Sequence, residues 1–239
     1  MANLIDRVKD RFHRDLAADP VTHGWVLNLY LGGERYPQRV CDYFQADFAP
    51  SEELAADLRK HARDEDKHVH LFAHGLRQLG QSVIELPIGD VFNEVIRSFT
   101  PGTFHILEAD APDVRRRKLA NFLAHAHHLE RRVARSFAYH MEACETAGQP
   151  VIAHLVAAVH KDESHHVSYT RDAVFDLLPR REATATLELH RRAEAKANLI
   201  FSARQVRAFL ACFEAVTPRH RRWLYRLSAF VMEGAGHLA

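Results

Sequence analysis

Cysteine is scarce in this sequence: Cys41, Cys144 and Cys212 are widely spaced among 239 residues. They form no Cys-x-x-Cys pair, which excludes zinc ribbons, rubredoxin-type iron centres and thioredoxin-like redox chemistry. Isolated cysteines of this kind are typical of small buried side chains in a reducing compartment. We therefore expect a cytoplasmic protein without disulfide bonds.

The sequence also lacks a charge bias and long apolar runs. Its formal net charge is +1, so it has no overall basic field, and a nucleic-acid partner is not expected. No apolar run approaches the roughly 18–20 residues that span a bilayer, so no membrane association is expected. The first residues, MANLIDRVKDRF, carry charges throughout, and we expect no secretory signal there.

Strand patterns are missing as well, whereas apolar residues recur at helical steps of three and four. The pattern predicts an all-α single domain over 1–239, with a core bundle over about 21–178 and C-terminal helices over about 181–233. A long helical crossover over 81–111, holding one or two shorter helices, is expected between the second and third core helices. The expected helices are 1–19 (a short helix or arm), 21–48, 51–79, 112–148, 150–178, 181–216 and 219–233. Pro37 is expected to kink the helix over 21–48.

A five-residue pattern, Asp-Glu-x-x-His, occurs twice in these predicted helices. The first copy is Asp64, Glu65 and His68, and the second copy is Asp162, Glu163 and His166. With 18 His and 16 Glu in the chain, chance alone gives about one Glu-x-x-His. The Asp before each Glu, and the apolar stripe around each copy, raise the two matches above that background.

Each copy follows a single glutamate that interrupts an apolar stripe about thirty residues upstream. These glutamates are Glu34, before Glu65, and Glu130, before Glu163. Residues three and four apart share one face of a helix, so four helices can direct four carboxylates and two imidazoles to a common point. Four buried carboxylates are costly alone, but two divalent cations neutralise them. This donor set suits iron or manganese with positions open for dioxygen.

Asp64 and Asp162 are predicted to orient the metal-bound histidines, because such a histidine usually donates its second ring N–H to a carboxylate. One Glu from each of two helices, plus Glu-x-x-His from two more, is the known carboxylate di-metal arrangement of helix bundles. The chain resembles the ferritin-like superfamily of non-haem, carboxylate-bridged di-iron proteins over roughly residues 21–178.

The resemblance implies a ferritin-like four-helix bundle that holds two irons, or one manganese and one iron. It implies that Glu65 and Glu163 bridge the metals, that Glu34 and His68 complete one ion, and that Glu130 and His166 complete the other. Catalysis would be carried by these ligands. Departures from related subfamilies are Phe72, where the radical-generating ribonucleotide reductase subunit has Tyr, and Ala134, where hydrocarbon monooxygenases have Thr. Val159, beside His160, stands where arylamine oxygenases have a further His.

Other residues lie near the predicted site by helical phase. His61, His127 and His160 are expected to be hydrogen-bonded core or rim histidines rather than a seventh ligand. Tyr30 and Tyr169 are expected to pack, with hydrogen bonding to ligands or electron relay as the alternative. An apolar wall that excludes water and directs oxidation to the substrate is expected from Phe72, Ala134, Phe137 and Val159.

We therefore expect an O₂-dependent oxidoreductase, an oxidase or oxygenase that acts on a small, largely apolar organic substrate. Electrons would come from a separate ferredoxin or reductase, because no flavin or iron–sulfur motif is present, and a homodimer is one expected assembly. The competing class is an iron-handling ferritin-like protein: a ferroxidase, a peroxidase or an iron-binding module. A helical interaction module with a vestigial site is the third alternative.

Overall fold

The computed structural model describes residues 4–38, 45–85, 91–100 and 104–238. The described part is all-α, with eight α-helices, one short 3₁₀ helix and no strand. The helices are α1 (Leu4–Ala17), α2 (Pro20–Gln38), α3 (Glu52–Gln78), α4 (Phe92–Arg97), α5 (Pro112–Thr146), α6 (Pro150–Leu177), α7 (Arg180–Phe213) and α8 (Arg219–Leu238), and the 3₁₀ helix is Ala46–Phe48. None of the described helices is both long and apolar enough to cross a membrane.

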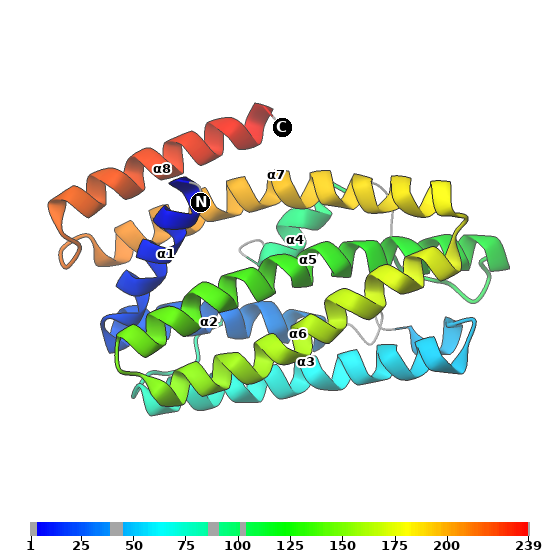
Figure 1. Cartoon of the computed structure of the whole chain (residues 1–239), viewed down its shortest axis with the longest axis horizontal. Coiled ribbons are helices and arrows are strands. Elements are labelled where there is room, and N and C mark those ends of the chain that lie inside the picture. Colours follow the sequence, from blue (N-terminus) through cyan, green and yellow to red (C-terminus); the bar gives the residue numbers. More distant parts are fainter. Residues whose placement is uncertain (1–3, 39–44, 86–90, 101–103, 239) are drawn as a thin grey trace.

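Four helices, α2, α3, α5 and α6, lie alongside one another and share one apolar core (Figure 1). Its members come from all four helices and include Leu27, Phe72, Phe137 and Val156, each no more than 1% exposed. Full burial of such a side chain stabilises the fold by about 1.5–3 kcal/mol. The shared core holds these helices in register around the predicted site.

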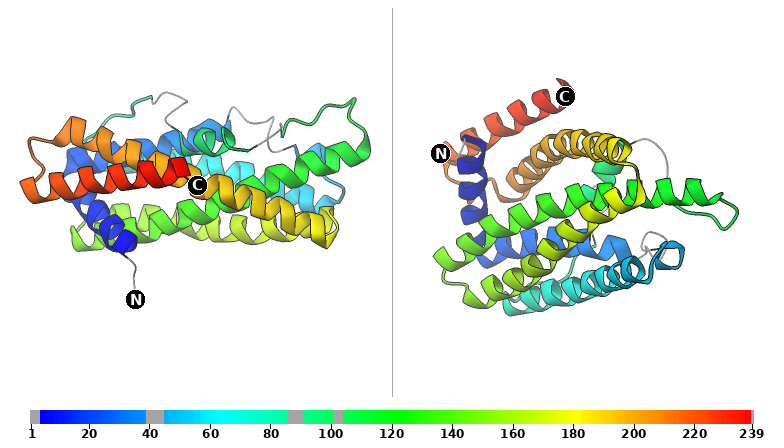
Figure 2. Two further views of the ribbon diagram at one scale, coloured as in Figure 1. Left: turned by 90° about the horizontal axis from the view of Figure 1, so that it is seen from above. Right: turned by 45° about the vertical axis from the view of Figure 1, so that its right-hand side comes forward.

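The remaining helices cover one side of these four. In Figure 1 α7 runs above α5, and α8 turns back beside α7, as the right-hand view of Figure 2 also shows. The short α4 packs on α7, and α1 crosses the end of α2 and α5 steeply. A second apolar cluster joins α1, α2, α7 and α8 around Leu16, Val26, Phe209 and Tyr225. This outer layer bears directly on α2, the helix that carries Glu34.

Local sequence signals account for the helix ends. The Ser51 side chain accepts a hydrogen bond from the backbone N–H of Leu54 (3.2 Å) and so caps α3, worth about 1 kcal/mol. Pro112 and Pro150 occupy first-turn positions, where the missing N–H costs nothing. Gly80 and Gly148 end α3 and α5 with φ of 67° and 66°, which favours glycine.

The predicted helix over 21–48 was too long. Helix α2 ends at Gln38, one residue after Pro37, which lacks the N–H needed for the last turn. Phe48 belongs to the separate 3₁₀ helix, and Cys41 and Phe44 lie outside the described residues. The crossover contains α4 in its described part.

Candidate metal centre

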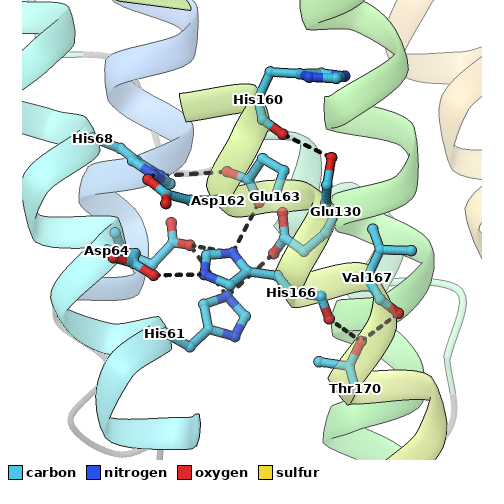
Figure 3. A network of polar contacts seen from close by, with 12 residues as sticks. His61, Asp64, His68, Glu130, His160, Asp162, Glu163, His166, Val167 and Thr170 are labelled. Carbon is cyan, nitrogen blue, oxygen red and sulfur yellow. Dashed lines mark hydrogen bonds and ion pairs between the residues drawn. The ribbon is translucent and has the colours of Figure 1, made fainter. Parts of the chain in front are cut away.

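The two Asp-Glu-x-x-His segments face each other across α3 and α6. His68 and His166 are fully buried, and each turns its Nδ1 toward the glutamates (Figure 3). His68 Nδ1 lies 3.4 Å from Glu34 Oε2 and 3.3 Å from Glu163 Oε1. His166 Nδ1 lies 3.0 Å from Glu163 Oε2 and 3.6 Å from Glu65 Oε1. The imidazoles therefore approach the same carboxylates from two helices.

The aspartates contact the far nitrogen of each histidine, and the contacts cross between the helices. His166 Nε2 donates to Asp64 Oδ2 at 3.2 Å, and His68 Nε2 donates to Asp162 Oδ2 at 3.3 Å. Lys67 bridges the two aspartates, with its Nζ 3.3 Å from Asp64 Oδ1 and in close contact with Asp162. A proton held on Nε2 leaves the Nδ1 lone pair of each histidine free to bind a cation.

Burial works to raise the pKa of Asp64, but hydrogen bonds from Lys60 and His166 outweigh burial, and the pKa is lowered. Asp64 therefore stays ionised and keeps accepting from His166. The pKa of His166 itself is lowered to about 2, first by burial and then by the neighbouring His61, so its ring is neutral at pH 7.

Two overlapping sets of ligand atoms result. The first set is Glu34, Glu65, His68 and Glu163, and the second set is His61, Glu65 and His166; within each, the ligand atoms lie within 4.8 Å of one another. Five of the six predicted ligands thus belong to one set or the other. Glu130 belongs to neither, although it is buried and its Oε1 lies 3.8 Å from His61 Nε2.

The carboxylates of these sets carry a pronounced charge conflict. Burial, then interaction with Glu34, raises the pKa of Glu65 to about 8; burial is also the main cause of a rise to about 7 at Glu34. Burial and the neighbouring Glu130 also raise the pKa of Glu163 well above its usual range. Among the described residues, Glu65 Oε1 and Glu163 Oε1 accept no hydrogen bond. Oxygen atoms left in this state fit divalent cations, which supply both the missing partner and the missing charge.

His61 is the member that sequence reasoning placed only near the site. Its ring stacks on His166 with centroids 3.7 Å apart, its Nε2 lies 3.2 Å from Glu65 Oε1, and its Nδ1 lies 2.6 Å from the Tyr169 hydroxyl. Burial lowers the pKa of His61, but interaction with the neighbouring carboxyl groups of Glu130 and Glu65 outweighs this effect and raises the pKa to about 9. The imidazolium thus offsets part of the carboxylate charge in the metal-free chain. Its position four residues before Glu65 is the sequence signal for this role.

The other residues predicted near the site lie at its rim or in the apolar core. His127 Nδ1 donates to the Val167 carbonyl (2.9 Å), and the imidazole of His160 points away from the cluster (Figure 3). Phe72 and Val159 are fully buried in the four-helix core, whereas Ala134 is half-buried. Tyr30 packs against Phe72 and Phe137 with ring centroids 5.5 Å and 5.0 Å away, and its hydroxyl has no hydrogen-bond partner among the described residues.

A cavity of about 420 Å³ adjoins the cluster, and Glu34 lies on its wall beside Gly33. Of the four predicted wall residues, Phe137 is among those that line it. The wall is otherwise largely apolar and includes Phe12 of α1, Phe92 of α4, Val206 of α7 and Tyr225 of α8. Helix α4 of the crossover and the C-terminal helices α7 and α8 therefore help to enclose this cavity.

Cavities of about 300–1,000 Å³ with apolar walls and few polar groups are typical of small-molecule sites. Comparison of the chain with known protein families, with curated proteins and with solved structures gave no match in any of the three. The chemistry of this centre is therefore argued from its own residues.

Proposed function

We propose that the chain is a ferritin-like, non-haem di-iron oxidase or oxygenase that oxidises a small, largely apolar organic molecule with dioxygen. One observation carries the proposal: Glu34 belongs to the buried carboxylate cluster and also lies on the wall of the 420 Å³ cavity. A molecule in this cavity would meet the metal centre directly. A protein that only handles iron needs no such chamber.

Five of the six proposed ligands belong to the two sets of ligand atoms, and this donor chemistry fits the proposed metal pair; the sixth ligand, Glu130, lies outside both sets and beside His61. Glu34 and His68 would complete one ion, Glu130 and His166 the other, and Glu65 and Glu163 would bridge them. Carboxylate oxygens with one imidazole per ion suit iron, or manganese with iron. When bound, two ferrous ions supply electrons and open coordination positions for dioxygen.

Two sets of the protein's own side chains have tasks in this proposal. The apolar wall, with Phe92, Phe137 and Val206, binds the substrate and excludes water. Asp64 and Asp162 keep a proton on Nε2 of the facing histidine, which leaves each Nδ1 lone pair for the metal. A one-electron donor protein, such as a ferredoxin or a reductase, would restore the reduced centre between turnovers.

The test begins with metal-free protein loaded anaerobically with Fe(II). We expect close to two irons per chain, and a panel of small apolar compounds should reveal a ligand that raises the melting temperature. Exposure to isotopically labelled dioxygen should then yield a labelled or dehydrogenated product of that ligand, identified by mass spectrometry. Glu65→Ala should take up less iron and give no product.

A matched variant separates the two main alternatives. The added side chain in Gly33→Leu enters open space beside Glu34, where a Cβ meets no atom within 4 Å. For an oxygenase this variant should keep its iron and lose the product. An iron-handling protein would instead oxidise iron without organic product, assemble into a large oligomer that accumulates iron, and behave identically with and without Gly33→Leu. Failure to bind iron in iron-replete conditions would leave only a helical module with a vestigial site.

A further inference from the structure

A second cluster of ligating side chains lies at the other end of α2 and α5. It comprises His23 of α2 with His140 and Cys144 of α5, all three 0% exposed, whose ligand atoms lie within 4.8 Å of one another. His140 and Cys144 are four residues apart and therefore share one face of α5. Helices α1, α2 and the C-terminal part of α5 meet at this end of the molecule (Figure 1). None of these residues takes part in the carboxylate centre.

The distances within this cluster match those around a metal ion. His23 Nε2 lies 3.1 Å from His140 Nε2 and 3.6 Å from Cys144 Sγ. Bonds of about 2.0–2.1 Å to nitrogen and about 2.3 Å to sulfur place the ligand atoms of a tetrahedral ion about 3.3 Å (N–N) and about 3.6 Å (N–S) apart. The three atoms can therefore contact one ion with little movement.

The surroundings also prepare these atoms for a cation. His13 Nδ1 lies 3.4 Å from His140 Nδ1, so a proton shared between these two nitrogens leaves His140 Nε2 as a lone pair facing the cluster. Burial lowers the pKa of His23 to about 4 and that of His140 well below its usual value, so both rings are neutral at pH 7. His13 also lines the large cavity, which gives an ion a route to the cluster.

We propose that His23, His140 and Cys144 form a second metal site, distinct from the carboxylate centre, for a d¹⁰ ion of soft or borderline character (Cu⁺ or Zn²⁺). Thiolate with imidazole is the donor set that such ions prefer over the oxygen-rich set around Glu65. Binding replaces the thiol proton of Cys144, which leaves to solvent, and no oxidation state changes. A thiolate neutralises Cu⁺ fully, whereas Zn²⁺ retains one positive charge that a hydroxide in the fourth position would balance.

The first experiment titrates metal-free, full-length protein with Cu⁺ under anaerobic, reducing conditions, and separately with Zn²⁺, against a chromophoric competitor. Wild type should bind one equivalent that Cys144→Ser weakens by at least roughly a hundredfold, since even partners of ligands contribute 10–100-fold. Cys212→Ser is the matched control, because Cys212 is an exposed free thiol on α7, and its affinity should equal that of wild type. Whichever ion shows this dependence on Cys144 is the ligand of the site.

Two measurements on wild type keep the test independent of how the variant folds. X-ray absorption at the metal edge should show one sulfur neighbour together with imidazole nitrogens. The ion at a hundredfold excess over its dissociation constant should raise the melting temperature by roughly 5 °C. Purely nitrogen and oxygen neighbours, or equal uptake by wild type and Cys144→Ser, would overturn the proposal. Neither result depends on oxygenase activity. The proposed function can therefore be wrong while this site is confirmed, and this site can be wrong while the proposed function is confirmed.

Discussion

Two buried clusters of ligating side chains share helix α2 and differ in how burial affects their charge. The carboxylate cluster gathers Glu34, Glu65 and Glu163, whose pKa values are raised because burial and mutual repulsion oppose ionisation. The histidine cluster gathers His23, His140 and Cys144, which burial keeps neutral. The first is costly to fold without cations, whereas the second folds at little cost without one.

Aromatic rings separate the two clusters. Tyr30 lies between them on α2, with its ring 5.3 Å from His140 on one side and 5.5 Å from Phe72 on the other. Phe137, also in this layer, is fully buried. An apolar layer of this kind keeps hard and soft donor sets apart, so each cluster can select its own ion.

The largest effect is expected from removing a carboxylate shared by both ligand sets. Glu65→Ala should lower the affinity for Fe(II) by at least roughly a hundredfold, since it removes an oxygen donor from each set. It should leave Cu⁺ or Zn²⁺ uptake that depends on Cys144 unchanged. Anaerobic titration of both metals measures the contrast, and Glu53→Gln, at an exposed position of the same helix, is the control. Equal losses of both metals in Glu65→Ala would mean that the clusters are not independent.

The pH dependence of the metal-free protein should show both clusters at once. The pKa of Glu65 is about 8 in the folded chain, above the unfolded value of 4.5. Its contribution to the free energy of unfolding is therefore full at low pH and is lost as pH rises toward 8. His23 has a folded pKa of about 4, below the unfolded value of 6.5, so its contribution is lost as pH falls from 6.5 toward 4. Each group changes stability by at most about 1.4 kcal/mol per pH unit.

Urea unfolding in the presence of a chelator, from about pH 4 to pH 9, measures both losses of stability: the alkaline limb of the curve, to which Glu65 contributes, and the acid limb, to which His23 contributes. Glu65→Gln should reduce the loss of stability toward alkaline pH, to which Glu34 and Glu163 also contribute, and His23→Gln should reduce the loss toward acid pH. Iron loading should reverse the alkaline limb, because cations displace protons from the carboxylates. An alkaline dependence of unchanged slope in Glu65→Gln would assign this dependence to groups other than Glu65.

Much of the fold was predictable because its signals are local. Apolar spacing, the Ser51 cap, the prolines at first-turn positions and the two C-terminal glycines determine where helices begin and end. The Asp-Glu-x-x-His repeats were visible because their residues lie one turn apart on single helices. The role of each residue at a metal stays a prediction.

The remaining features depend on packing between helices. His23 meets His140 and Cys144 only because side chains of α2 and α5 reach one another across the bundle, and no repeat in the sequence marks that contact. The cavity wall depends on how α7 and α8 fold back, which periodicity does not determine. The excess length predicted for the helix over 21–48 has a simpler cause: an apolar residue at a step of three or four, such as Phe48, need not belong to the same helix.

A smaller effect is expected at the partners of the histidine ligands. Asp64→Asn keeps the shape but removes the charge that holds the proton on His166 Nε2, and it should weaken Fe(II) binding about 10–100-fold. The exposed Asp66, two residues further along α3, offers a matched control, and Asp66→Asn should bind iron as wild type does. Competition titration with Fe(II) measures both. Unchanged affinity in Asp64→Asn would show that His166 is oriented by its packing against His61 instead.

The smallest effect contrasts the open side of the carboxylate cluster with the packed core toward the histidine cluster. A Cβ added at Gly33, beside Glu34, meets no atom within 4 Å, so Gly33→Ala should stabilise α2 by about 0.5–1 kcal/mol through helix propensity alone. A Cβ at Gly75 lies 3.1 Å from Leu27 Cδ1 and 3.4 Å from Ile152 Cδ1. Because Leu27 is buried in the four-helix core, overpacking should outweigh helix propensity there, and Gly75→Ala should lose about 1 kcal/mol of stability. Urea unfolding of the two variants with a chelator present measures both changes, and a similar gain in each would show that the core around Leu27 is as loosely filled as the cavity beside Glu34.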